Sequence, residues 1–182
     1  MKKVVLVVLL VVSSLSYVNA QSVTYGVKVG ANFSNFTGDS FDSDMITRMH
    51  AAVTGDIAMS DSFSLQPELM FSAEGAKASA GGGELKLNYF RIPVMVKYYV
   101  SSGFSIDAGP QVGFLVAAED ENGTDLKSAY ESTEFGFNVG STYLMDNGIN
   151  FSVRYNIGLT DVADGVDAKN GGFQLSIGYV FQ

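Results

Sequence analysis

The chain has 182 residues, a formal net charge of −8 and no cysteine. Its length suits one domain or one closed sheet, and its acidity argues against nucleic acid as a partner, since nucleic-acid binding depends on basic side chains. The lack of cysteine excludes disulfides, thiolate metal sites and cysteine nucleophiles. Apolar residues make up 47% and charged residues 16% of the chain, and the charged share is below the roughly 25% of an ordinary soluble domain.

The first twenty residues predict a secretory signal peptide. The basic start "MKK" is followed by the apolar run "VVLVVLLVV" and by small residues up to Ala20, which is the order of regions in such a leader. The apolar run is too short to span a bilayer, which disfavours a retained anchor. We expect residues 1–20 to be removed and residues 21–182 to form the mature domain. Loss of Lys2 and Lys3 then takes the net charge from −8 to −10.

Alternation of apolar and polar residues recurs eight times after the leader and predicts eight β-strands. No later segment offers about 18 consecutive apolar residues, so no transmembrane helix is predicted. Short connections that alternate with long ones are typical of an up-and-down barrel. In chain order the runs span residues 23–33, 48–59, 63–73, 85–100, 104–117, 133–143, 149–159 and 173–181, with tight turns at 60–62, 101–103 and 146–148 and longer polar loops at 34–47, 74–84, 118–132 and 160–172.

The two faces of these strands predict that the apolar face points outward into lipid. A soluble lipocalin-like barrel, with apolar side chains inside, is the alternative. However, the polar face is rich in glycine, as at Gly26, Gly30, Gly136 and Gly140, and this suits a crowded interior better than a solvated surface. The apolar face also carries more large side chains than the narrow lumen of an eight-stranded barrel can hold.

Aromatic residues lie near both ends of most strands on the apolar face. At ~3.4 Å per residue and a ~40° tilt, most pairs span roughly 21 Å of height, close to the ~25 Å apolar band between the girdles of a membrane barrel. Strand propensity alone would predict no preference for strand ends. The pairs are Tyr25 and Phe33, Phe63 and Phe71, Phe90 and Tyr98, Phe104 and Phe114, Phe135 and Tyr143, and Phe173 and Phe181.

Together these patterns predict an all-β fold, an eight-stranded antiparallel up-and-down transmembrane β-barrel in the outer membrane. We expect both termini in the periplasm and the longer, acidic loops outside the cell. Six inward charges fall near one height, and we expect them to form a structural lumen charge network: Lys28, Asp56, Glu68, Lys97, Asp107 and Arg154. A second layer further out holds Arg48, His50, Glu74, Arg91 and Glu134.

Buried charges persist only when they are paired and hydrogen-bonded, so we expect the inner layer to form a salt-bridged plug. Lys28 and Asp56 are the first expected pair because their strands are neighbours. A selectivity ring in a small pore is the alternative, for which eight strands leave little room.

The stretch "FSIDAGPQVGFLVA" at residues 104–117 contains a G-x-x-x-G pattern that also occurs in packed membrane helices. Residues four apart share one face of a strand as well, so we expect Gly109 and Gly113 to face the lumen together with Asp107. Pro110 then falls on the lipid face. It lacks an N–H group, and we expect a β-bulge there.

No motif marks a catalytic site, and we expect no enzymatic activity, no cofactor and no metal. His50 is the single histidine and could act as a general base in a barrel hydrolase that acts on lipid or peptide. A structural role in the lumen is the favoured interpretation, because no nucleophile or orienting carboxylate is marked by a motif. The run "EDENGTD" (119–125) fails the EF-hand pattern, which would put Ala118 and Ala129 at ligand positions. Weak binding of Ca²⁺ or Mg²⁺ by these clustered acids is the alternative that the sequence leaves open.

Five stretches, "YGVKVGANFSNFTGD", "FSLQPELMFSAEGAK", "LNYFRIPVMVKYYV", "IDAGPQVGFLVAA" and "STEFGFNVGSTYLMDNGINFSVRYNIGLTDV", cover most of the mature chain. In these stretches the chain resembles the PorT-like outer-membrane β-barrel proteins of Bacteroidetes. The resemblance implies a barrel without catalytic residues, and the family's namesake is tied to protein export. We expect any specific activity to lie in the acidic extracellular loops, as adhesion, envelope integrity or an accessory role in protein secretion. We expect outer-membrane lipid and envelope or secretion proteins as partners, and a monomer. Phe181 is penultimate here, whereas outer-membrane strands usually finish on a terminal aromatic residue.

Overall fold

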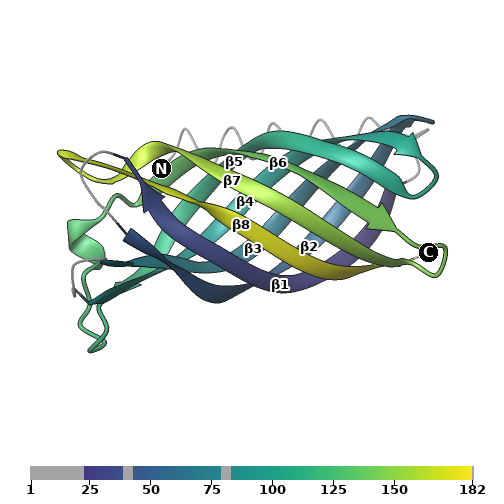
Figure 1. Ribbon diagram of the computed structural model, residues 1–182. Coiled ribbons are helices and arrows are strands. Elements are labelled where there is room, and N and C mark those ends of the chain that lie inside the picture. The colour runs from purple at the N-terminus through teal and green to yellow at the C-terminus, as the bar shows by residue number, and fades with distance from the viewer. Residues whose placement is uncertain (1–22, 39–42, 79–82, 182) are drawn as a thin grey trace.

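The computed structural model describes residues 23–38, 43–78 and 83–181, and the expected signal peptide (1–20) lies outside these ranges. Each strand pairs antiparallel with the next, and β1 also pairs with β8, so the sheet closes into a barrel (Figure 1). The predicted eight-stranded antiparallel barrel is therefore confirmed. The elements are β1 (Val23–Thr37), β2 (Ser43–Ser60), β3 (Phe63–Ala78), β4 (Glu84–Ser101), β5 (Phe104–Glu119), the 3₁₀ helix η2 (Lys127–Ala129), β6 (Thr133–Leu144), β7 (Ile149–Ala163) and β8 (Val166–Phe181).

The barrel has two different ends. At one end, which we call the turn end, lie the short turns β2–β3, β4–β5 and β6–β7 together with the first residue of β1 and the last of β8 (right side of Figure 1). Gly103 and Gly148 in two of these turns have φ angles of 78° and 86°, which glycine adopts without strain. The opposite end, which we call the loop end, carries the β5–β6 loop with η2 and the tip of the β7–β8 hairpin.

The connections at the loop end are shorter than the sequence predicted, because the strands continue further. β1 runs to Thr37, β2 begins at Ser43, and only residues 164–165 join β7 to β8. In these extensions most apolar side chains, such as Phe36 and Ile46, face inward, whereas Met45 and polar ones such as Lys77 are exposed. Apolar side chains thus face outward between the aromatic bands and inward beyond them. Where this switch occurs the period-two pattern is interrupted, so the sequence predicts that the strand ends there.

Outward-facing aromatic residues form two bands around the barrel. At the loop end the register places Phe71, Phe90 and Phe114 side by side on β3, β4 and β5. At the turn end Phe63 contacts Tyr98, with ring centroids 4.9 Å apart. Between the bands the outward side chains are apolar and exposed, among them Val27, Val53, Leu69, Val96, Ile106, Val139, Val153 and Leu175. A belt of this kind fits the hydrocarbon layer of a bilayer.

The β-bulge expected at Pro110 is absent. Pro110 lies opposite Phe137 in an unbroken β5–β6 register, and the β4–β5 register is also the same on both sides of it. The missing N–H of proline removes one hydrogen bond of the ladder but does not require an extra residue in the strand. None of the helices in the described part of the chain is long and apolar enough to cross a membrane.

Candidate functional site

The centre of the lumen charges is Glu68 on β3. Its side chain is fully buried and accepts from Lys28 Nζ at 2.7 Å and from both terminal nitrogens of Arg154 at 2.8 and 3.1 Å. Gln66 Nε2 donates to the same carboxylate at 2.7 Å. Four donors therefore occupy the two oxygens, and charge-assisted hydrogen bonds of this kind offset the cost of removing the carboxylate from water.

Lys97 extends this arrangement towards the turn end. Its Nζ lies 3.1 Å from Gln66 Oε1 and 3.4 Å from Asp56 Oδ2. Asp107 is opposite Lys97 in the β4–β5 ladder and accepts hydrogen bonds from the hydroxyls of Ser105 and Thr142. We call the six charged groups with Gln66 the inner network: Lys28, Asp56, Gln66, Glu68, Lys97, Asp107 and Arg154.

The expected pair of Lys28 with Asp56 is wrong. The β1–β2 register places Lys28 opposite Ala52, whereas Asp56 lies opposite Thr24, which precedes Lys28 by four residues on β1. Four residues correspond to ~13 Å along a strand, so the two side chains are at different levels of the lumen. Lys28 instead reaches across β2 to Glu68 on β3. The heights inferred from the sequence were misleading because the shear of a closed barrel staggers neighbouring strands.

A second group of buried polar residues surrounds Arg91 on β4. Arg91 forms ion pairs with Glu74 on β3 and Glu134 on β6, and its guanidinium lies 4.9 Å from the centre of the Tyr89 ring. Asn170 Nδ2 on β8 donates to Glu134 at 2.6 Å and to the Tyr89 hydroxyl at 3.1 Å. Arg91 thus joins β3, β4 and β6, and Asn170 links β8 to the same group.

His50 connects this group to the seam between β1 and β8. Its Nδ1 lies 2.7 Å from Asn32 Oδ1 and its Nε2 lies 2.8 Å from Ser176 Oγ. Asn32 Nδ2 donates to Ala73 O, which can only accept, so Asn32 Oδ1 faces His50. His50 Nδ1 therefore carries the hydrogen, and Nε2 accepts from the Ser176 hydroxyl.

Asn32 also donates to Ser72, which donates to Glu74 beside Arg91. The outer network is thus one continuous chain: Ser176, His50, Asn32, Ser72, Glu74, Arg91, Glu134, Asn170 and Tyr89. Sequence reasoning found its charged members and His50 but missed the neutral ones. The signal that could have found Asn32, Ser72 and Ser176 is that they share the inward parity of their strands.

An apolar cluster, which we call the cap, closes the loop end of the lumen and was also missed. Leu126 and Tyr130 of the β5–β6 loop pack against it. In this cluster the apolar side chains of the strands point into the barrel, as in a soluble protein. This is expected where the strands have left the membrane. The buried members are Phe36, Ala76, Leu87, Tyr89, Leu115, Ala118, Val162 and Ala168.

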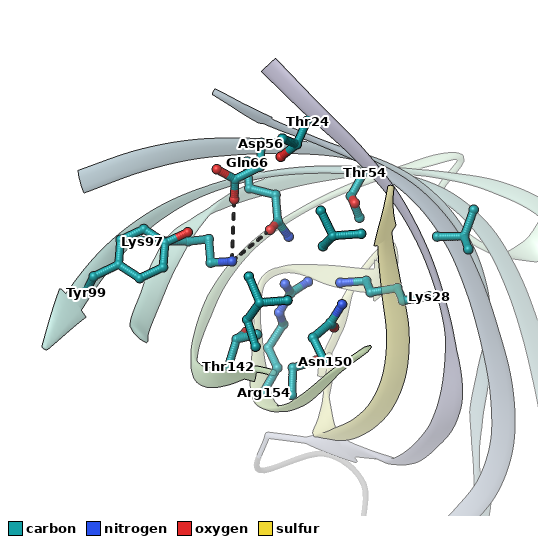
Figure 2. Close-up of a pocket in the computed structure, with 14 residues that line it drawn as sticks. Thr24, Lys28, Thr54, Asp56, Gln66, Lys97, Tyr99, Thr142, Asn150 and Arg154 are labelled. Carbon is teal, nitrogen blue, oxygen red and sulfur yellow. Dashed lines mark hydrogen bonds and ion pairs between the residues drawn. The ribbon is translucent and has the colours of Figure 1, made fainter. Parts of the chain in front are cut away.

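A cavity of about 70 Å³ lies in the turn-end half of the lumen. Figure 2 shows Lys28, Lys97 and Arg154 pointing towards it from three sides, with Lys97 bound to Asp56 and Gln66. Thr54, Thr142, Asn150 and other polar side chains complete the lining. Thr24, Leu144 and Val180, which lie near the ends of their strands at the turn end, also line the cavity, so the cavity lies close to that end of the barrel.

The loop end presents an acidic surface. Its exposed acids include Glu119, Glu121, Asp125, Glu131, Asp161, Asp164 and Asp167. Lys169 lies 3.1 Å from Asp161 and 2.8 Å from Asp167. Hydrogen bonds from the backbone N–H groups of Thr124 and Asn122 hold the pKa of the Asp120 carboxyl below its usual value. Within the described residues, no group of three or more histidine, cysteine or acidic side chains could hold a metal ion.

Comparison with known proteins places the chain in a family. Residues 19–164, well over half of the chain, match the family described as outer membrane protein beta-barrel domain. The chain belongs to this family of outer-membrane β-barrels. A search of curated proteins found no match.

Solved structures with the same fold include other small membrane barrels. The crystal structure of Neisserial surface protein A (NspA) has a TM-score of 0.60 and 12% identity, over 88% of this chain and 99% of that chain. The attachment invasion locus protein Ail of Yersinia pestis, bound to the heparin analogue sucrose octasulfate, has a TM-score of 0.54 and 14% identity, over 88% and 99%. At such low identity the likeness shows the fold alone.

Proposed function

We propose that this outer-membrane β-barrel is a non-enzymatic protein with a plugged lumen, and that its specific activity lies in the acidic surface at the loop end. The observation that carries the proposal is the group around Glu68. Lys28, Arg154 and the amide of Gln66 all donate hydrogen bonds to its carboxylate, and the bonds from the two cations cross the lumen. A barrel closed in this way offers its partners only its outer surfaces. The activity is adhesion, envelope integrity or an accessory role in protein secretion.

In this proposal the turn end faces the periplasm and the loop end faces the outside of the cell. Residues 1–20 are removed on export, and the mature barrel is a monomer surrounded by outer-membrane lipid. The short turns support this orientation, since membrane barrels have short periplasmic turns and longer extracellular loops. The names of Ail and NspA, an attachment protein and a surface protein, support an activity at the cell surface. The resemblance to PorT-like proteins supports the secretion role.

The enzyme alternative depends on the chain of Ser176, His50 and Asn32. Their hydrogen bonds, at 2.8 and 2.7 Å, have the lengths of a nucleophile, a base and an orienting group. However, His50 is only 2% exposed and sits within the outer network, beneath the cap. His50 is held on both ring nitrogens by buried or half-buried partners of this network, so we assign these residues a structural role.

Charge reversal at the loop end tests this proposal. The variant with Glu121→Lys and Asp164→Lys changes two exposed acids at the loop end, and Asp61→Lys changes an exposed acid in a turn at the other end. We expect the loop-end variant to resemble a deletion strain in cell adhesion, detergent resistance and protein secretion, whereas Asp61→Lys behaves like the wild type. Normal surface level and heat-modifiable gel mobility confirm that both variants fold. Equal behaviour of the two variants would contradict the proposal.

A further inference from the structure

We propose that the turn-end cavity is a binding site for a small oxyanion of the phosphate or sulfate class. The cavity has a volume of about 70 Å³, compared with the ~10–15 Å³ that a cavity needs to hold one water, so it has room for a single tetrahedral anion. Among the described residues that line it are three cations, Lys28, Lys97 and Arg154, and one carboxylate, Asp56. This site is separate from the acidic surface at the loop end.

The inner network as a whole is electrically balanced, with three cations and three carboxylates, but its hydrogen-bonding capacity is not. Glu68 already accepts from four donors, and Asp107 accepts from two hydroxyls. An ammonium group has three N–H donors and a guanidinium has five. Lys28 directs one of these donors to Glu68, and Arg154 directs two. The donors left over on these cations are the groups that an anion in the cavity would use.

The neutral lining adds further donors. The hydroxyls of Thr24, Thr54 and Ser152 and the amide of Asn150 also face the cavity, and the labelled ones surround the three cations in Figure 2. Thr142 lines the cavity too, but its hydroxyl already donates to Asp107. Lys28, Lys97 and Arg154 are each no more than 6% exposed. Hydrogen bonds between charged groups are stronger at such buried positions than in water. A site whose lining carries three cations against one carboxylate favours an oxyanion over a cation.

Titration of the full mature chain in detergent micelles with sodium phosphate tests the proposal, with sodium chloride at matched ionic strength as the reference. We expect saturable shifts in the amide NMR signals of Thr54, Thr142 and Asn150. Lys28→Met removes a cation but leaves Glu68 paired with Arg154, so it weakens binding about tenfold, the value of one charge-assisted hydrogen bond. Lys127→Met, at an exposed loop-end position, leaves binding unchanged.

The variant Asp56→Asn provides a test of opposite sign. It removes the single carboxylate of the lining and is expected to tighten phosphate binding while the cations stay in place. If Lys28→Met does not fold, this variant and Thr54→Val, which weakens binding, still decide the matter. Three results would each overturn the proposal. They are NMR shifts that sodium chloride reproduces, equal phosphate affinities of Lys28→Met and Lys127→Met, and weaker phosphate binding by Asp56→Asn. Parallel titration with glycerophosphate distinguishes a free anion from a lipid headgroup: binding of phosphate alone assigns the site to the free anion.

Discussion

Glu68 and His50 each join strands that the sheet itself does not pair. Glu68 on β3 binds Lys28 on β1 and Arg154 on β7, and His50 on β2 binds Ser176 on β8. Such bonds cross the lumen or pass over a neighbouring strand, so they hold the barrel closed in addition to the backbone ladder. His50 can reach β8 because Gly30, the residue of β1 between them, has no side chain.

The space over Gly30 leads to a prediction. A Cβ at Gly30 would lie 2.0 Å from Leu175 O and 2.7 Å from His50 Cε1, whereas a Cβ at Gly55 meets nothing within 4 Å. Gly30→Ala is therefore expected to lower the free energy of unfolding by about 1–3 kcal/mol, the usual cost of overpacking, because backbone and His50 must both move. Gly55→Ala is the matched control, with little expected change. Urea unfolding in lipid vesicles measures the free energy of unfolding of both variants. Equal values would show that the contact between Gly30 and His50 tolerates a methyl group.

Among the strands, β6 is the shortest of the eight described, with 12 residues, while β5 and β7 on either side continue towards the loop end. The β5–β6 loop fills the resulting gap in the wall. Leu126 N donates to Ala118 O at 2.8 Å, and Glu131 N donates to Val162 O at 2.9 Å. The side chains of Leu126 and Tyr130 then pack on the cap. The β5–β6 loop thus packs against the barrel and forms part of its wall.

Leu126→Asp tests this role of the loop. A carboxylate placed against the apolar cap is poorly solvated, so we expect the loop to detach and to be cut rapidly by an added protease between residues 119 and 133. Ser128→Asp, at an exposed position of η2, adds the same charge without touching the cap and is expected to leave the rate of cleavage unchanged. The rest of the barrel should keep its heat-modifiable mobility in both variants. Similar cleavage rates would show that the loop is not anchored by Leu126.

At the scale of the whole molecule, the lumen is closed by three successive layers. The inner network lies nearest the turn end, the outer network follows, and the cap closes the loop end. The inner network is made mainly of ion pairs, the outer network combines the ion pairs of Arg91 with a hydrogen-bonded chain through His50, and the cap is apolar packing. Eight strands leave an interior that side chains just fill, and in this barrel those side chains are held by their partners.

This layering predicts that the purified barrel does not conduct ions in a planar bilayer. We expect no stepwise current from the wild type, because the buried ion pairs would have to break before an ion could pass. Lys28→Ala combined with Arg154→Ala removes both cationic partners of Glu68 but leaves the outer network and cap intact, so this variant should also stay closed. Wild-type conductance that the double substitution abolishes would contradict the plug and would favour a selectivity ring.

Period-two alternation and aromatic spacing are local properties, so the number of strands, their antiparallel order and the face that meets lipid could all be predicted from the amino-acid sequence. The sequence also identified the inward position of Lys28, Glu68, Lys97 and Arg154. The ion-pair partners of these side chains could be read only from the three-dimensional structure. Lys28 binds Glu68 and not Asp56, since register and shear are set by closure of the whole sheet. The same holds for neutral partners such as Asn32 and Ser176, which chain position alone does not bring together, and for the cap, whose side chains change faces where the strands leave the membrane.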